Sequence, residues 1–332
     1  MRRYDHISRK HTAEDLKIMQ AWPLSRKIQV TQAKIMEWHE RHNHKTAISF
    51  SGGVDSTVLL DLARRCYPDI PAVFCDTTIE FPEIIDFVKS KSNVAIVRPK
   101  LCVTCKKCVG GCFAKVIQDY GICYPSKEVA KCIENARRGK VWALNRFKGL
   151  NADGTKSWYK EQMYKRWAHL VDAPYKISDM CCVVIKEKPL EKWYKESGNV
   201  PIIGTLASES IRLRNAWYIT GCNGFDAKKK SSKPLSFWTH DDILRYLRDF
   251  NIPYAGIYGD IVTDKKGKLR TRGEQRTGCS LCVVGCHHDK TNKFLRLKEQ
   301  HPDIWNFGIN TLGLGAFFDS VGVNYGKVGC KA

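Results

Sequence analysis

The stretch "SFSGGVDSTVLLDL" (residues 49–62) decides the fold, because two glycines, an aspartate and two serines separate an apolar strand from an apolar helix. Residues 46–50 are β-branched and apolar, which predicts a strand, and residues 57–63 carry leucines at helical spacing. At such a junction the free backbone N–H groups and the helix dipole favour an anion over the helix N-terminus. The stretch therefore predicts a phosphate-binding loop.

The side chains of the loop agree with that prediction. Gly52 and Gly53 let the backbone approach an oxyanion closely, while Ser51 and Ser56 add hydroxyl donors. No Lys-Ser/Thr pair follows the glycines, so the loop is not a Walker loop. It is similar to the SGGxDS signature of the PP-loop superfamily, whose members bind ATP and release pyrophosphate or act on related adenylyl nucleotides. The alternative is a glycine-rich turn in which an aspartate caps the helix.

The pattern beyond the loop predicts the fold class. Strand patterns at residues 70–77 and 93–99 alternate with a helical pattern at 81–91, and the alternation returns after residue 199. This predicts an α/β fold: a parallel twisted sheet, PP-loop or Rossmann-like, with helices on both faces and ligands at the carboxyl ends of the strands. A Cys-rich insertion and a C-terminal Cys-rich segment accompany it. The expected segments are N-terminal helices (1–45), the nucleotide-binding domain (46–100 and 174–260), the insertion (101–173) and the C-terminal segment (261–332).

Composition limits the partners. Lys and Arg number 55 against 34 Asp and Glu, a net charge of +21, which predicts an anionic partner unless the basic surface is merely solvated. Residues 156–169, 226–233 and 265–272 mix cations with aromatic or polar residues, as nucleic-acid-binding surfaces do, and a helix with a core-facing aromatic stripe is the alternative. We see no apolar run of membrane-spanning length and no signal peptide, so we expect a cytoplasmic protein with no membrane partner.

The fifteen cysteines predict ligation or redox chemistry rather than disulfides. "CVTCKKCVGGC" has the C-x2-C-x2-C-x3-C spacing of bacterial ferredoxins, with ligands Cys102, Cys105, Cys108 and Cys112. A 4Fe-4S cluster, a zinc ion and uncoordinated thiols are the alternatives for this run. If two clusters form, Cys112 or Cys286 could ligate either one.

Several separated motifs together resemble the phosphoadenosine phosphosulfate (PAPS) reductase family of the PP-loop superfamily, in its iron-sulfur-containing type. They are "SFSGGVDS" (49–56), "DTTIEFPE" (76–83), "SDMCCVVIKEKPL" (178–190), "GTLASES" (204–210), "KPLSFW" (233–238) and "RTGCSLC" (276–282). The double cysteine and the later pair are similar to the CCxxRKxxPL and GCxxC motifs of iron-sulfur adenylylsulfate reductases. The resemblance implies that Cys181, Cys182, Cys279 and Cys282 hold one 4Fe-4S cluster.

The resemblance also implies a nucleotide site and catalytic residues. Lys186 matches the lysine of the family motif, whereas Ile185 replaces its arginine. ATP or PAPS would bind a set of residues drawn from the motifs, and Asp55 could orient Mg2+ or the attacking group. That set is Ser49, Ser51, Gly52, Gly53, Asp55, Ser56, Asp76, Thr77, Gly204, Arg212 and Arg214.

The implied activity has two versions. Reductases end in a mobile ECGxH-type tail with a nucleophilic cysteine, but this chain ends "NYGKVGCKA", so Cys330 either replaces that cysteine or is incidental. Asp55 and Ser56 are intact, as in family members that cleave ATP, and the basic charge then favours ATP-dependent thiolation of a tRNA or DNA. A cysteine desulfurase, thioredoxin or ferredoxin could be the sulfur or electron donor. A non-catalytic iron-sulfur sensor that binds nucleotide or nucleic acid is the alternative from another class.

Overall fold

The computed structural model describes residues 9–99, 111–157, 162–288 and 293–326. The chain divides into two compact units. Unit 1 consists of Met1–Asp76, Glu80–Val97 and Leu190–Thr277. Unit 2 consists of Thr77–Ile79, Arg98–Pro189 and Gly278–Ala332.

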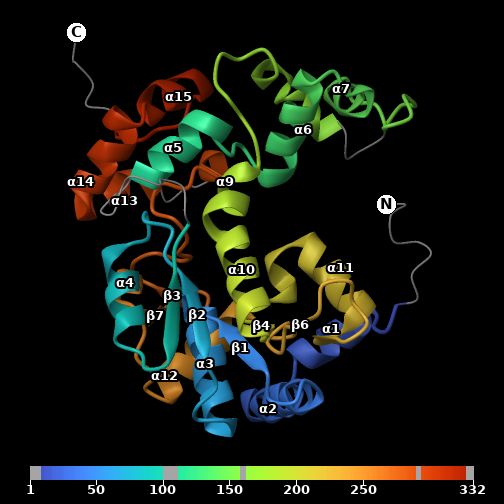
Figure 1. Cartoon of the computed structure of the whole chain (residues 1–332), viewed down its shortest axis with the longest axis vertical. Coiled ribbons are helices and arrows are strands. Elements are labelled where there is room, and N and C mark those ends of the chain that lie inside the picture. Colours follow the sequence, from blue (N-terminus) through green and yellow to red (C-terminus); the bar gives the residue numbers. More distant parts are fainter. Residues whose placement is uncertain (1–8, 100–110, 158–161, 289–292, 327–332) are drawn as a thin grey trace. The chain divides into compact units, whose positions relative to one another are not determined.

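Unit 1 is built on a six-stranded sheet in the order β3-β2-β1-β4-β6-β5 (Figure 1). Neighbouring strands pair in parallel from β3 to β6, and β5 alone is antiparallel among the described strands of this sheet. The predicted α/β class, a largely parallel sheet flanked by helices, is therefore confirmed, with a mixed sheet in place of a purely parallel one. The strands are β1 (Thr46–Ser49), β2 (Ala72–Cys75), β3 (Val94–Val97), β4 (Val200–Ile203), β5 (Asn223–Gly224) and β6 (Ser231–Ser232).

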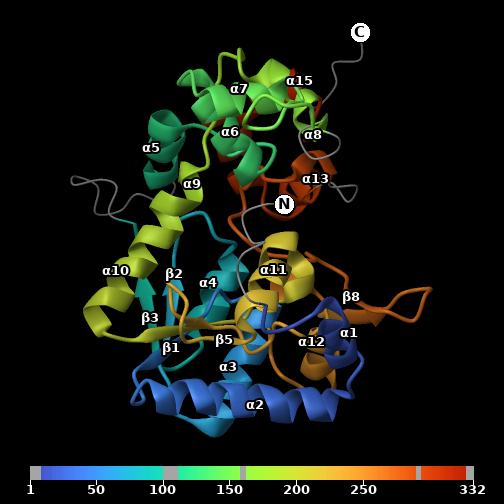
Figure 2. The same ribbon diagram turned by 90° about the vertical axis from the view of Figure 1, so that its right-hand side faces the viewer.

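The helices of unit 1 bury apolar faces on this sheet and on one another. Helix α3 (Val54–Cys66) packs on β1, and both α2 (Leu24–Arg41) and α12 (His240–Asp249) pack on α3, as Figure 2 shows for the long helix α2. Thr239 caps α12 in a reciprocal capping box with Asp242. The remaining helices are α1 (Ala13–Gln20), α4 (Pro82–Lys89) and α11 (Ile211–Thr220), with short 3-10 turns at Ala207–Glu209 and Gly256–Tyr258.

A two-stranded antiparallel hairpin also belongs to unit 1. It consists of β7 (Ile261–Thr263) and β8 (Leu269–Thr271), whose partners run from Ile261 opposite Thr271 to Thr263 opposite Leu269. Its turn is held by Asp264, whose carboxylate accepts the backbone N–H groups of Lys266 and Lys268.

Unit 2 is mostly helical. Its centre is Tyr124, which is fully buried and makes edge-to-face contacts with the rings of Trp167, His287 and Phe317. Ile122 pairs in parallel with Ile177, which fixes the chain just before the cysteine pair at 181–182. The helices are α5 (Gly111–Tyr120), α6 (Lys127–Arg137), α7 (Val141–Phe147), α8 (Gln162–Lys165), α9 (Met180–Cys182), α13 (Lys293–Gln300), α14 (Pro302–Asn306) and α15 (Leu314–Val321). Helix α10 (Lys188–Ser197) carries the chain from unit 2 into unit 1.

No helix among the described residues combines the length and the apolar character needed to cross a membrane. The division into four segments that the sequence suggests remains a prediction, because the two compact units do not test its boundaries.

Candidate functional site

The loop between β1 and α3 is shaped by its own serines. The Ser56 hydroxyl donates to Gly53 O at 2.9 Å and accepts the Ser51 N–H at 3.2 Å, and the two hydroxyl oxygens lie 3.0 Å apart. Helix α3 begins at Val54, after Gly53 in an extended conformation. The serines therefore fix the curvature of the loop before any ligand arrives, and the N-terminal turn of α3 is the place where an anion is favoured.

Sterics require glycine at one point of this loop, Gly52, and at one point that packs against it, Gly204. Gly52 has φ +73°, and a Cβ there would lie 2.8 Å from a methyl carbon of Ile84. At the end of β4, a Cβ on Gly204 would lie 3.1 Å from the carbonyl oxygen of Asp55. Both contacts are shorter than ordinary van der Waals separations, so the loop packs closely on α4 and on the end of β4.

A pocket in unit 1, the loop pocket, opens over this loop. Five of the predicted nucleotide-binding residues line it: Ser51, Gly53, Asp55, Ser56 and Gly204. Its other lining residues are Val54, Thr205, Glu209, Tyr258, Gln275, Arg276 and Thr277. The pocket lies at the carboxyl ends of β1 and β4, where ligands of parallel sheets bind.

Charge in the loop pocket centres on Asp55. Burial, and then the nearby charge of Glu209, raise the pKa of Asp55 to about 7, although Arg276 opposes the shift. One carboxylate oxygen of Asp55 is buried without a hydrogen-bond partner, as is the Thr205 hydroxyl. Arg276 is held in place by an ion pair with Glu209 at 2.5 Å. The pocket thus offers one guanidinium and two polar groups that still need partners.

The other predicted nucleotide-binding residues lie outside the lining of the loop pocket. Ser49 hydrogen-bonds the Tyr194 hydroxyl at 2.8 Å, and Asp76 is buried at the end of β2. The Thr77 hydroxyl lies 3.4 Å from the sulfur of Cys279 in unit 2. Gly52 packs against Ile84 of α4. Arg212 and Arg214 are exposed on α11.

Sequence reasoning missed the cation that does line the pocket, Arg276. Tyr258 was missed as well: its hydroxyl lies 2.7 Å from that of Thr277 and accepts the Val54 N–H at 3.4 Å, so it fastens the 275–277 segment to the start of α3. Arg276 and Thr277 belong to the "RTGCSLC" motif, which was the available signal. Tyr258 carried no comparable signal, because it enters the site only through tertiary folding.

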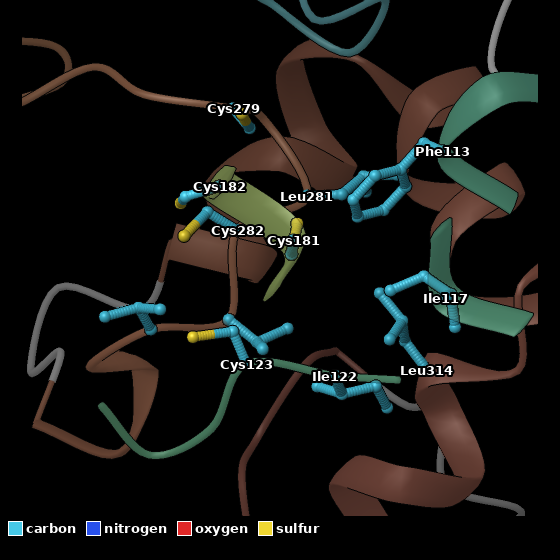
Figure 3. Close-up of a pocket in the computed structure, with 12 residues that line it drawn as sticks. Phe113, Ile117, Ile122, Cys123, Cys181, Cys182, Cys279, Leu281, Cys282 and Leu314 are labelled. Carbon is cyan, nitrogen blue, oxygen red and sulfur yellow. The ribbon is translucent and has the colours of Figure 1, made fainter. Parts of the chain in front are cut away.

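A second cavity, the cysteine cavity, lies in unit 2 and collects the four cysteines that the resemblance names (Figure 3). Cys181, Cys182, Cys279 and Cys282 line it together with Cys123. All other lining residues are apolar: Phe113, Ile117, Ile122, Leu281, Val283, Val284 and Leu314. Two motifs almost a hundred residues apart in the sequence are thus brought to one cavity.

The Cys279–Cys282 turn is anchored at several points. The Cys282 N–H donates to Cys279 O at 3.0 Å. The ammonium of Lys293 on α13 donates to Cys279 O at 3.0 Å and to Cys282 O at 3.2 Å. Ser280 donates its N–H and its hydroxyl to Ile79 O, at 2.7 Å and 2.8 Å. These bonds hold the two thiols in a fixed register.

The Cys181–Cys182 pair ends the short helix α9, and a π-helical turn, Val183–Glu187, follows at once. Lys186, the predicted catalytic lysine, lies on this turn and is half-buried. Ile185 is fully buried, which explains how an apolar residue is accommodated where the family motif has arginine. π-Turns of this kind occur frequently at functional sites.

The thiols of the cysteine cavity influence one another electrostatically. Burial raises the pKa of the Cys181 thiol, and the neighbouring thiols of Cys182, Cys279, Cys282 and Cys123 raise it further. Burial likewise raises the pKa of Cys182, against the charge and hydrogen bond of Lys127 and the charge of Lys186. Burial raises the pKa of Cys123 to about 12. Such thiols become thiolates readily only when a metal takes the place of the proton.

The donor set of this cavity fits an iron-sulfur cluster. Thiolate ligands in apolar surroundings suit zinc or iron-sulfur centres and do not suit Mg2+. Among the described residues, no three His, Cys, Asp or Glu side chains converge where one metal ion could sit. A 4Fe-4S cluster does not require such convergence, because each of its four cysteines binds a different iron.

Some predicted residues cannot be placed. Cys102, Cys105, Cys108 and Cys330 lie outside the described residues. Cys112 belongs to α5, but its side chain is not among those described. Cys286 begins a 3-10 turn, Cys286–His288, and is not a lining residue of the cysteine cavity.

Comparison with known proteins gives distant relatives. An uncharacterized protein of Methanocaldococcus jannaschii is 24% identical over 283 residues, which are 84% of this chain and 50% of that protein, so the chain spans about half the length of this relative. The chain is also similar to two adenosine 5'-phosphosulfate reductases. That of Oceanobacillus iheyensis is 24% identical over 76% of this chain and 77% of the relative. That of Staphylococcus epidermidis is 26% identical over 68% of this chain and 70% of the relative. A solved PAPS reductase from Candida auris, in a phosphate complex, covers 79% of this chain and 99% of its own at 15% identity and TM-score 0.37.

The family assignment rests on a broader match. The family model for the phosphoadenosine phosphosulfate reductase domain matches residues 45–110 and 137–330, which is most of the chain and includes both the loop pocket and the cysteine pairs. The match confirms the assignment suggested by the sequence motifs. The chain belongs to the phosphoadenosine phosphosulfate reductase family.

Proposed function

We propose that this chain is an enzyme that binds an adenine nucleotide in the loop pocket and carries out sulfonucleotide or sulfur-transfer chemistry with the aid of a 4Fe-4S cluster. The observation that carries the proposal is the cysteine cavity, where Cys181, Cys182, Cys279 and Cys282 line one apolar space. Family membership and the loop pocket support the nucleotide half of the proposal.

The residues of the loop pocket would bind the charged part of the nucleotide. Phosphate oxygens would lie over the N-terminus of α3, and Arg276 would pair with them through its planar guanidinium. The unpartnered oxygen of Asp55 would either carry a proton or help to hold Mg2+ on a phosphate chain. Both arrangements remove the repulsion between the carboxylate and the phosphates.

In the reductase version, the substrate is PAPS or adenosine phosphosulfate. A cysteine thiolate attacks the sulfur atom, a new S–S bond forms, and the bond from sulfur to the bridging phosphate oxygen breaks, releasing the nucleotide. A dithiol donor such as thioredoxin then attacks the enzyme sulfur. Sulfite leaves with the electron pair, and the donor becomes a disulfide. A bound cluster would supply fixed charge near the reacting sulfur.

In the transferase version, the substrate is ATP. An oxygen of the acceptor attacks the α-phosphorus, and pyrophosphate leaves, which makes AMP the next leaving group. A sulfur nucleophile from a donor such as a cysteine desulfurase then displaces AMP. The intact Asp55 and Ser56 favour this version, and both residues line the loop pocket.

The test is anaerobic purification followed by incubation with ATP, PAPS or adenosine phosphosulfate, with iron, sulfide and zinc measured on the same sample. Sulfite from a sulfonucleotide with a dithiol donor would establish the reductase version, and pyrophosphate from ATP the transferase version. Zinc without sulfide would contradict the cluster. Iron and sulfide with neither product would favour the redox sensor.

A nucleic acid is the second candidate, as the sulfur acceptor. The observation that favours it is the β7–β8 hairpin, on which Lys265, Lys266, Lys268, Arg270 and Arg272 are all exposed. Clustered cations on one hairpin suit a phosphate backbone. Retention of tRNA or duplex DNA at low salt, lost as salt rises, is the expected result.

A further inference from the structure

One wall of the cysteine cavity comes from a segment that the family model does not match. The family model matches no residue of 111–136. Four residues of this segment nevertheless line the cavity: Phe113, Ile117, Ile122 and Cys123. Phe113, Ile122 and Cys123 are all at most 6% exposed, so the segment is packed tightly against the thiols. This chain therefore surrounds its cysteine pairs with residues that the shared family pattern does not supply.

The same segment carries a cation, the ammonium of Lys127, close to the thiol of Cys182. Lys127 is the first residue of α6, and Ser126 caps that helix by accepting the Val129 N–H at 3.2 Å. The Lys127 ammonium lies 3.4 Å from a carboxylate oxygen of Glu187, on the π-helical turn that follows Cys182, and its positive charge opposes the rise in the pKa of the Cys182 thiol. The cap fixes the backbone of Lys127, and the ion pair with Glu187 places its ammonium beside the π-helical turn that follows Cys182.

We infer that Lys127 is a positioning residue for the cluster, one that holds the Cys182 thiolate and raises the reduction potential of the bound cluster. This inference rests on the proposed function, since it needs a cluster in the cysteine cavity. Hydrogen bonds to the ligand sulfurs and the net charge around a cluster are among the factors that set its potential. A cation beside a ligand sulfur stabilises the more negative, reduced cluster, and so favours reduction.

Neighbouring lysines act differently. Lys293 donates to the backbone carbonyls of Cys279 and Cys282, which shapes their turn. Lys186 affects Cys182 through its charge. Lys127 differs from both in coming from the segment 111–136, which the family model does not match.

The experiment compares Lys127→Gln, Lys127→Arg and a matched control, Lys131→Gln. Lys131 is exposed one turn further along α6, so its substitution removes the same charge from the same helix. Each anaerobically purified chain is assayed for iron, sulfide and its visible spectrum, and the midpoint potential is measured by reductive titration. We expect a lower potential in Lys127→Gln, a potential near that of the wild type in Lys127→Arg, and no change in Lys131→Gln.

The outcomes separate this inference from the proposed function. Equal potentials in cluster-loaded Lys127→Gln and Lys131→Gln would overturn the role of Lys127 alone. A wild-type chain that binds no iron and sulfide would overturn the proposed function itself. If Lys127→Gln loses its iron, retention by Lys127→Arg supports the inference, whereas loss from both variants overturns it, because charge would then not suffice.

Discussion

At the scale of single residues, Asp55 makes a prediction about pH. Its pKa is raised from 3.8 to about 7, so the folded chain holds this proton more tightly than the unfolded chain does. The resulting stability is present at low pH and is lost as the pH rises through that interval. We therefore expect Asp55→Asn to be more stable than the wild type at pH 8, by roughly 1–4 kcal/mol, and to differ little at pH 4.

Urea unfolding at the two pH values checks this prediction. The charged neighbours Glu209 and Arg276 remain in both proteins, so the comparison isolates the carboxyl group of Asp55. Glu37→Gln, which removes an exposed carboxylate from α2, is the control for the loss of one negative charge. An Asp55→Asn variant with the same pH profile as the wild type would mean that the carboxyl is not desolvated as described.

The five thiols of the cysteine cavity make a second residue-scale prediction. We expect Cys182→Ser to lose iron, because a 4Fe-4S cluster needs four cysteine ligands and the resemblance assigns Cys182 as one of them. We expect Cys123→Ser to keep iron, because Cys123 is the fifth cysteine among the residues that line the cavity. Iron and sulfide per chain are the measurement. Loss of iron from Cys123→Ser but not from Cys182→Ser would reassign the ligands.

The residue scale is also where prediction from sequence reached its limit. Ser51, Gly53, Asp55 and Ser56 are contiguous, so a local pattern was enough to bring them to one pocket. Arg276 lies more than two hundred residues away, and only the folded chain places it over the same loop. Arg212 and Arg214 were predicted to bind phosphate, but both are exposed and neither lines the pocket. Charge in a sequence does not tell which side of a helix faces a pocket, so this part of the prediction had no local basis.

At the scale of elements, the β7–β8 hairpin carries the prediction about nucleic acid. We expect the double variant Lys266→Glu/Lys268→Glu to bind tRNA or duplex DNA roughly tenfold more weakly at low salt, because it removes cations that would neutralise phosphates. Both residues make their turn contacts through backbone N–H groups, so the hairpin should still form. Filter binding at two salt concentrations measures the effect.

The control for the hairpin is Lys192→Glu/Lys195→Glu on α10, which changes the net charge equally at exposed positions. If both double variants weaken binding to the same extent, the hairpin has no special role and only the overall charge matters.

The elements themselves were largely predictable where hydrophobic periodicity was strong. The helix predicted at 81–91 is α4, and the strands predicted around 70–77 and 93–99 are β2 and β3. The short strands β5 and β6 were not predictable, because two residues have no period to read. The antiparallel pairing of β5 depends on tertiary contacts that the sequence pattern does not contain.

At the scale of the whole molecule, the residues of the two candidate sites divide cleanly between the two units. Every lining residue of the loop pocket belongs to unit 1, and every lining residue of the cysteine cavity belongs to unit 2. The sequence anticipated the four cysteines and five residues of the loop pocket, but it did not assign Thr77 to the unit of the cysteines, although Thr77 lies in unit 2 beside Cys279. We therefore expect binding of a nucleotide and retention of a cluster to depend on different residues and to be separable.

This separation predicts the effect of removing the cluster. We expect Cys182→Ser/Cys282→Ser to lose its iron and to form neither sulfite nor pyrophosphate. We expect the same variant to bind the nucleotide with an affinity within about twofold of the wild type, because no residue lines both sites. Calorimetric titration with ATP and with adenosine phosphosulfate, each with and without Mg2+, measures the affinity. Cys66→Ser on α3, a half-buried cysteine outside both sites, is the control. A large loss of nucleotide affinity confined to the double variant would contradict the separation and would mean that the loop pocket depends on the cluster for its shape.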